Sequence, residues 1–199
     1  MSFSRDKIQT FFNPLAGKTA TFLLDGREAN MHFAQMVSTL VAERGEAMAI
    51  LDLDAFYSSR ADRIFSTGSN PSESTTIIVP KPGSDIETDF SHLFEARQEV
   101  LVIDSLNSFF HLISLDDWHA RSRKLTFAIE ALSHYAKTNS KAVILSMYRR
   151  ERYAGTGTRR PISRLSDLTV SVTVRGAQVV LRTEKGSGWT GGEFLTRIL

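Results

Sequence analysis

The residues with the clearest chemical signal lie in one short segment, 149–164. It contains a single acidic residue, Glu151, and six arginines: Arg149, Arg150, Arg152, Arg159, Arg160 and Arg164. The segment carries a charge of +5 while the whole chain totals +2, so the remaining residues sum to −3. Arginine binds phosphate through paired hydrogen bonds and stacks on bases, and Tyr153 offers a further stacking surface. This composition predicts a loop that contacts a nucleic-acid backbone; the competing interpretation is a solvated loop with incidental charge.

A second segment has the position of a nucleotide-binding loop but not its residues. Such a loop reads G-x-x-x-x-G-K-[ST] and connects a strand to a helix. Aligned on Gly26, the pattern places Met31 at the second glycine, His32 at the lysine and Phe33 at the hydroxyl that holds magnesium. Methionine lacks the backbone freedom of glycine, histidine is largely neutral at pH 7, and phenylalanine has no oxygen for a metal. We therefore expect a vestigial nucleotide site that does not bind a triphosphate in the usual way.

The elements around these segments alternate between strands and helices. Short apolar runs rich in β-branched residues predict strands at Thr19–Leu24, Ala47–Leu53, Thr75–Val79, Glu99–Ile103 and Lys141–Met147. Apolar residues three and four positions apart predict helices at Ala29–Arg44, Arg60–Phe65, Ile86–Arg97 and Trp118–Thr138. This alternation is typical of an α/β fold with a mostly parallel central sheet flanked by helices.

The C-terminal part has a different pattern. Apolar and polar residues alternate over Asp167–Val174 and Ala177–Thr183, on either side of a turn predicted at Arg175–Gly176. This pattern predicts a C-terminal antiparallel hairpin added at the edge of the sheet. A short last strand is expected at Glu193–Ile198, after the glycine-rich stretch 186–192.

Two further segments resemble a known family. The segment 50–57 (ILDLDAFY), followed by Arg63 and Ile64, resembles a segment of archaeal RadA and RadB and of the eukaryotic strand-exchange recombinases. The segment 100–106 (VLVIDSL) resembles their Walker B strand. The similarity spans residues 15–199 and implies a RecA-like P-loop-NTPase fold. The chain is closest in layout to RadB-like paralogues, with a degenerate Walker A motif.

The resemblance also suggests roles for two carboxylates. Asp54 is at the position where active members have a glutamate that activates water. Asp104 is at the position of the Walker B aspartate, which in active members holds magnesium through a water molecule. Without a phosphate loop, neither residue has a nucleotide to act on. We therefore interpret Asp54 and Asp104, like Asp52, as structural remnants that hydrogen-bond local backbone or arginines.

The composition limits the remaining possibilities. The chain has no cysteine and no apolar stretch of the roughly 20 residues needed to cross a bilayer. Its histidines have no metal-ligand spacing, so no metal and no cofactor are expected. We expect one RecA-like core domain over residues 1–199, without a separate N-terminal DNA-binding domain, in the cytoplasm and without membrane contact.

The leading functional hypothesis is a recombinase paralogue without ATPase activity. It would bind single- or double-stranded DNA through residues 149–164 and assist a RadA-type recombinase or another RecA-like subunit in homologous recombination and repair. Three alternatives stay open. They are an Elongator-type RecA-like accessory subunit that binds tRNA, a KaiC-like regulatory homologue, and an ATPase with an atypical phosphate loop.

Overall fold

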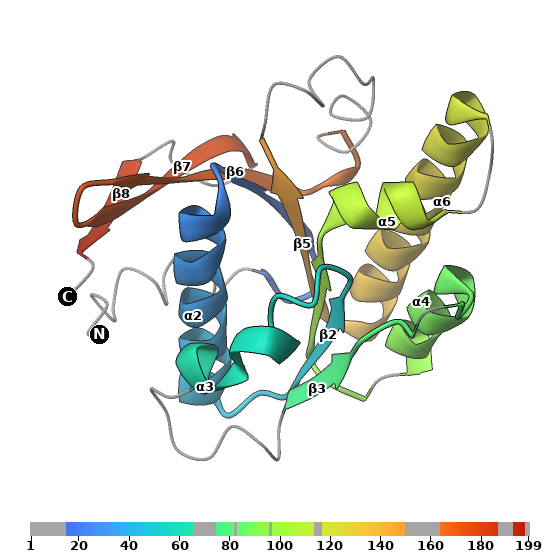
Figure 1. Cartoon of the computed structure of the whole chain (residues 1–199), viewed down its shortest axis with the longest axis horizontal. Helices are drawn as coiled ribbons and strands as arrows, with labels where there is room; N and C mark the ends of the chain where they lie inside the picture. Colours follow the sequence, from blue (N-terminus) through green and yellow to red (C-terminus); the bar gives the residue numbers. More distant parts are fainter. Residues whose placement is uncertain are drawn as a thin grey trace.

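A computed structural model describes residues 15–65, 75–81, 83–95, 97–113, 117–149 and 164–186, together with the backbone of 193–197. Within these residues, eight strands form one sheet in the order β3-β2-β4-β5-β1-β6-β7-β8. They are β1 (Thr19–Leu24), β2 (Met48–Asp52), β3 (Thr75–Ile78), β4 (Val100–Asp104), β5 (Ala142–Tyr148), β6 (Leu168–Arg175), β7 (Gln178–Gly186) and β8 (Glu193–Arg197). Figure 1 shows how the strands and the helices are arranged.

The strands β3, β2, β4, β5, β1 and β6 pair in parallel in this order. This arrangement explains why their sequences are rich in apolar residues. Every residue of β1, β2 and β4 is buried, because helices cover both faces of the sheet. The five strands expected before Tyr148 are confirmed, with bounds that differ by no more than one residue from those of the apolar runs.

The C-terminal hairpin is confirmed with two corrections. Arg175 pairs with Gln178, so the turn residues are Gly176 and Ala177, one position later than expected. Gly176 takes a φ of 58°, which a residue without Cβ adopts at little cost. β7 and β8 do add antiparallel pairs, but β6 itself runs parallel to β1.

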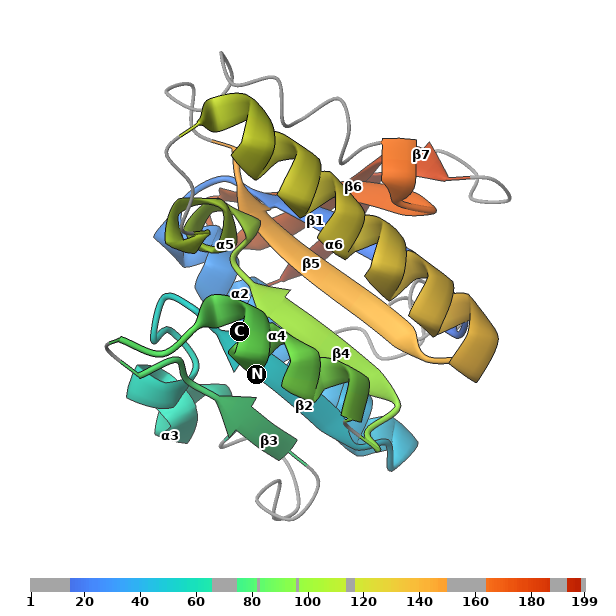
Figure 2. The same cartoon turned by 90° about the vertical axis from the view of Figure 1, so that its right-hand side faces the viewer.

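The helices divide between the two faces of the sheet. α2 (Arg27–Arg44) and α3 (Ala61–Ile64), which follows a single 3-10 turn at Ser58–Arg60, lie on one face. α4 (Ile86–Glu95), α5 (Leu106–Leu112) and α6 (Trp118–Asn139) lie on the other, seen from the front in Figure 2. Helix α5 was not expected from the sequence. Its N-cap is Ser105, whose hydroxyl accepts a hydrogen bond from the Ser108 N–H at 3.4 Å.

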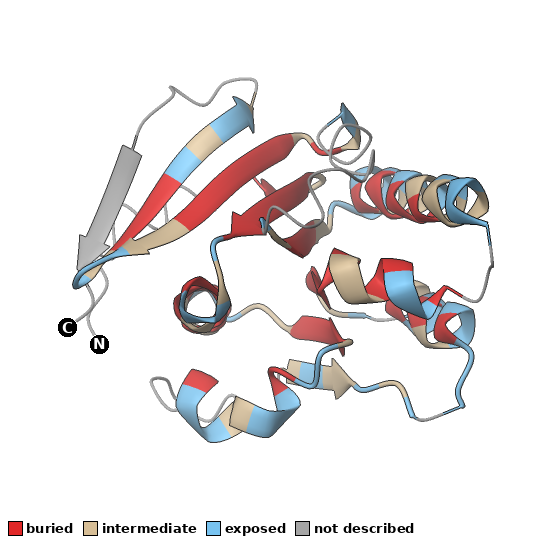
Figure 3. Cartoon of the chain, turned by 45° about the horizontal axis from the view of Figure 1, so that its top comes forward, coloured by how far each residue is buried: buried red, intermediate tan, exposed pale blue. Residues whose placement is uncertain are grey.

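Each face has its own core, because successive side chains of a strand point to opposite faces. Phe22 and Leu24 of β1 pack toward α2, while Leu23 packs toward α6. Figure 3 shows the buried residues gathered on the central strands and on the inner sides of the helices. Asp52 and Asp104 are buried at the carboxyl ends of β2 and β4, where the chain leaves these two cores.

Candidate functional site

The connection between β1 and α2 contains no loop long enough to wrap a phosphate chain. Gly26 is the N-cap of α2, with a φ of 92°, and the helix begins at Arg27, two residues earlier than expected. The Asn30 N–H already donates to the Gly26 carbonyl at 3.2 Å. Residues 27–33, which the motif would place in a loop and at a helix start, therefore form the first two turns of α2.

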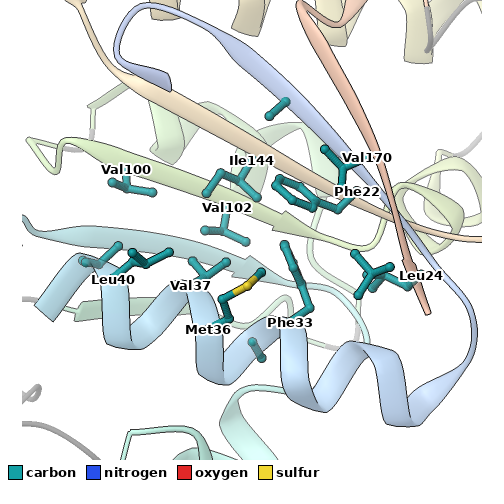
Figure 4. Close-up of a cluster of buried hydrophobic side chains, with 14 of the residues drawn as sticks. Phe22, Leu24, Phe33, Met36, Val37, Leu40, Val100, Val102, Ile144 and Val170 are labelled. Atoms are coloured by element: carbon teal, nitrogen blue, oxygen red, sulfur yellow. The ribbon is translucent and has the colours of Figure 1, made fainter. Parts of the chain in front are cut away.

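The three residues at the motif positions all pack within the protein. Phe33 is completely buried, and its ring centroid lies 4.6 Å from that of Phe22 (Figure 4). Met31 is partly buried and packs against the same cluster. His32 is buried as well, and its desolvation lowers its pKa although Glu28 and Gln35 act in the opposite direction. A neutral imidazole is therefore favoured at this position at pH 7.

The two aspartates after β2 have different surroundings. Asp52 is completely buried, and its oxygens accept the N–H groups of Phe56 and Ser58, each at 2.7 Å. These bonds shape the turn that follows the strand. Asp54 is exposed and accepts hydrogen bonds from two serine hydroxyls on the neighbouring element, Ser105 at 2.8 Å and Ser108.

Asp104, at the end of β4, is completely buried. Its Oδ1 accepts the hydroxyl of Ser146, and its Oδ2 accepts the Nδ2 of Asn30 at 3.3 Å. Burial raises the pKa of Asp104 to about 6, with smaller contributions from the charges of Asp54 and Asp52, while the two hydrogen bonds oppose the shift. Both carboxylate oxygens are thus hydrogen-bonded to neighbouring side chains.

Asn30 and two tyrosines extend this buried polar group. The same Asn30 Nδ2 also donates to the Tyr148 hydroxyl at 2.8 Å. Desolvation and the nearby Asp104 raise the pKa of Tyr148 to about 12, and similar causes raise the pKa of Tyr57. Within the described part of the chain, the Oδ1 of Asn30 and the hydroxyl of Tyr57 have no hydrogen-bond partner. These three residues were not among the site residues expected from the sequence, although Tyr148 directly follows a predicted strand.

A cavity of about 390 Å³ opens at the carboxyl ends of β1, β2, β4 and β5. This edge is where open α/β sheets place their ligands. Among the residues that line it are Gly26, Arg27, Asp54, Arg60, His111 and Tyr148. Asp104 lies beneath this site rather than in its lining. Of the residues expected in the vestigial site, Gly26 and Asp54 line this cavity. Met31, His32 and Phe33 are part of α2 and are not among its lining residues.

The structure describes only the two ends of the predicted nucleic-acid segment. The Arg149 N–H donates to the Leu24 carbonyl at the end of β1, and its guanidinium lies 3.5 Å from the carboxylate of Glu184. Arg164 is exposed, and its carbonyl accepts the Lys185 ammonium at 3.0 Å. The other five residues, Arg150, Arg152, Tyr153, Arg159 and Arg160, lie outside the described residues.

The described residues contain no group of three or more His, Asp or Glu side chains that could hold a metal ion. No helix among them is both long enough and apolar enough to cross a membrane.

Comparison with known proteins supports the fold. No protein-family model and no curated protein matches the sequence. Among solved structures, the chain is similar to the KaiC-like protein PH0186 from the hyperthermophilic archaeon Pyrococcus horikoshii OT3. The TM-score is 0.64 at 13% identity, and the match covers 90% of this chain and 85% of that chain. The predicted RecA-like α/β fold is thus confirmed.

Proposed function

We propose that this RecA-like protein does not hydrolyse ATP and instead binds nucleic acid through residues 149–164. In this proposal it binds single- or double-stranded DNA and assists a RadA-type recombinase in homologous recombination or repair. The observation that carries the proposal is the start of α2 at Arg27, directly after Gly26. A helix at this place leaves no loop of backbone N–H groups to surround a triphosphate.

The surroundings of the aspartates support the absence of catalysis. A magnesium ion held by a Walker B aspartate needs a carboxylate that can reach it or its water shell. Here the oxygens of Asp104 are engaged by Ser146 and Asn30, and those of Asp54 by Ser105 and Ser108. In this proposal both groups contribute to structure rather than to phosphate chemistry.

The charge distribution supports nucleic acid as the partner. Six arginines within residues 149–164 give this segment a strongly positive charge in a chain whose other residues are net negative. Clustered arginine is the electrostatic feature expected of a surface that contacts phosphates. Glu184, which pairs with Arg149, is the described carboxylate positioned to compete with a phosphate at one end of the segment.

Salt dependence of binding tests the proposal. The logarithm of the affinity should fall with the logarithm of salt concentration, with a slope of about −3 to −4 for four arginine contacts. Replacing Arg149, Arg150, Arg159 and Arg160 by alanine should bring the slope toward zero. The matched lysine variant of the same four positions, which keeps the charge, should retain most of it. Glu184→Gln should strengthen binding, because it removes the carboxylate that pairs with Arg149.

Two results would contradict the proposal. Unchanged affinity and salt slope in the four-alanine variant would remove the segment from the function. ATP turnover would contradict the absence of catalysis, and micromolar ATP binding in calorimetry would contradict the loss of the triphosphate site. Measuring single-stranded DNA, duplex DNA and tRNA at one salt concentration separates a recombination role from an Elongator-type role, since the latter requires preference for tRNA.

A second candidate is a KaiC-like regulatory homologue, and the similarity to a KaiC-like protein favours it. This function requires a protein partner rather than a nucleic acid. A pull-down from native lysate after nuclease digestion distinguishes the two candidates when combined with the binding data. A partner that survives digestion, together with no measurable nucleic-acid affinity, would favour the KaiC-like function.

A further inference from the structure

We propose that the cavity at the carboxyl edge of the sheet binds a single phosphate monoester group. This inference does not depend on nucleic-acid binding by residues 149–164, because it concerns a different surface with its own hydrogen-bond donors. The feature that carries it is the pair of arginines, Arg27 and Arg60, that line one cavity.

Neither arginine is neutralised by an acidic partner within the described residues. Arg27, at the first position of α2, is exposed, and its charge acts on the neighbouring hydroxyl of Tyr148. Arg60 lies over the ring of Phe56, 4.7 Å from its centroid, and donates to the Ser59 hydroxyl at 2.9 Å. A guanidinium held against an aromatic ring in this way keeps further N–H groups available for a phosphate.

The remaining polar groups of the cavity fit the same class of ligand. The Tyr148 hydroxyl accepts from Asn30 and is protonated at neutral pH, so its own hydrogen can be donated. In the part of the chain that the structure describes, no side chain caps the N–H groups in the first turn of α2. Among the described residues that line the cavity, Asp54 is the one carboxylate. It already accepts two serine hydroxyls, which partly offset its repulsion of an anion.

The geometry favours one phosphate group over a triphosphate chain. A triphosphate needs successive donors along its length, and here the helix replaces the loop that would supply them. The volume of about 390 Å³ nevertheless leaves room for the organic group that carries the phosphate. The same chemistry occurs in a mononucleotide and at the phosphorylated end of a nucleic-acid strand.

Titration of the purified full-length protein with AMP, inorganic phosphate and adenosine tests this site. AMP and phosphate should bind saturably and compete with each other, while adenosine should not bind. Arg27→Ala and Arg60→Ala should each weaken AMP binding at least tenfold, since each removes a charge-assisted hydrogen bond. Asp54→Asn should strengthen it several-fold, because it removes a like charge from the lining.

The matched control is Arg123→Ala, which removes an exposed arginine of α6 that does not line the cavity. It should leave AMP affinity unchanged, and all variants should keep the circular dichroism spectrum of the parent. An equal loss of affinity in Arg123→Ala and Arg27→Ala would overturn the proposal, as would the absence of AMP and phosphate binding in the parent.

A further comparison identifies the source of the phosphate. One oligonucleotide is measured with a 5′-phosphate and with a 5′-hydroxyl at the same salt concentration. A gain from the 5′-phosphate that Arg27→Ala removes would assign the site to strand ends, while AMP binding without this gain would assign it to small molecules. Binding of the 5′-hydroxyl strand tests residues 149–164 alone, so failure of either proposal is recognised separately.

Discussion

At the residue scale, Asp104 shows how a carboxylate at the end of a central strand can be part of a core. In this protein it is buried, hydrogen-bonded by Ser146 and Asn30, and has a pKa of about 6. Its pKa in the unfolded chain should be close to the ordinary value of 3.8. The folded state therefore binds more protons than the unfolded state between these two values, and stability should fall as the pH rises through this window.

We expect Asp104→Asn to remove this dependence. Above pH 6 the ionised side chain costs about 3 kcal/mol, from about 1.4 kcal/mol per pKa unit. An amide avoids this cost, and Asn30 can turn its unpartnered Oδ1 toward the new NH₂ group. Urea unfolding at several pH values should give a variant more stable by about 1–3 kcal/mol at pH 8, with a flatter profile between pH 4 and 6.

Asp52→Asn is the matched control. Both oxygens of Asp52 accept backbone N–H groups, and an amide would present its own N–H to one of them. This variant should lose about 1–3 kcal/mol at pH 8. If Asp104→Asn were less stable than the parent protein at pH 8, the ionised Asp104 carboxylate would be stabilising the fold.

At the element scale, α2 combines the start of a helix at the carboxyl edge of the sheet with the packing of one face of the core. Its apolar side, which includes Phe33, Met36, Val37 and Leu40, faces the strands and fills the core on that face (Figure 4). Phe33, at the motif position for the magnesium-binding hydroxyl, contributes its whole side chain to this packing. Restoring the motif residues would therefore destabilise the packing of α2, whatever its effect on nucleotide binding.

Variants of Phe33 test this role. Phe33→Thr should cost about 3–5 kcal/mol, because it leaves a cavity next to Phe22 and buries a hydroxyl. Phe33→Leu should cost less than about 1.5 kcal/mol, because it keeps most of the apolar volume. The triple change Met31→Gly, His32→Lys and Phe33→Thr should be at least as destabilised as Phe33→Thr and should bind ATP weakly at best.

Phe127→Thr on α6 provides the comparison. Its side chain is 71% exposed, so the same change of residue type should alter stability by no more than about 0.5 kcal/mol. Chemical denaturation measures all of these variants. A Phe33→Thr protein as stable as Phe127→Thr would contradict the packing role of Phe33.

At the scale of the whole molecule, the segment rich in arginine connects opposite ends of the sheet. The Arg149 N–H bonds to Leu24 at the carboxyl end of β1, and the Asp167 N–H bonds to Thr19 at its amino end. A strand of this length spans about 17 Å at about 3.3 Å per residue. The segment is therefore a crossover between the parallel strands β5 and β6, rather than a loop confined to one edge.

Replacing residues 150–163 by a Gly/Ser linker of equal length separates the connection of β5 to β6 from the proposed nucleic-acid binding. Such a linker reaches the same anchor points, so the melting temperature should change by only a few degrees. Nucleic-acid affinity and its salt dependence should be lost together with the four arginines in these residues. Strong nucleic-acid binding by the linker variant would place the binding surface elsewhere, whereas unfolding would mean that this segment contributes to the core.

Local patterns were enough to predict the strands, the long helices and the hairpin. A strand buried on both faces needs a run of apolar residues, and a helix packed on a sheet needs apolar residues three and four positions apart. Local patterns did not predict α5, which has only seven residues and directly follows β4, and they placed the start of α2 two residues too late. The hydrogen-bond donors to Asp104 are Asn30 and Ser146, which are 74 and 42 residues away in the sequence. The cavity likewise joins residues from separate elements. Such contacts depend on the order of the strands and on the crossover between β5 and β6, and no local pattern of residues encodes a distance between segments that meet only when the sheet forms.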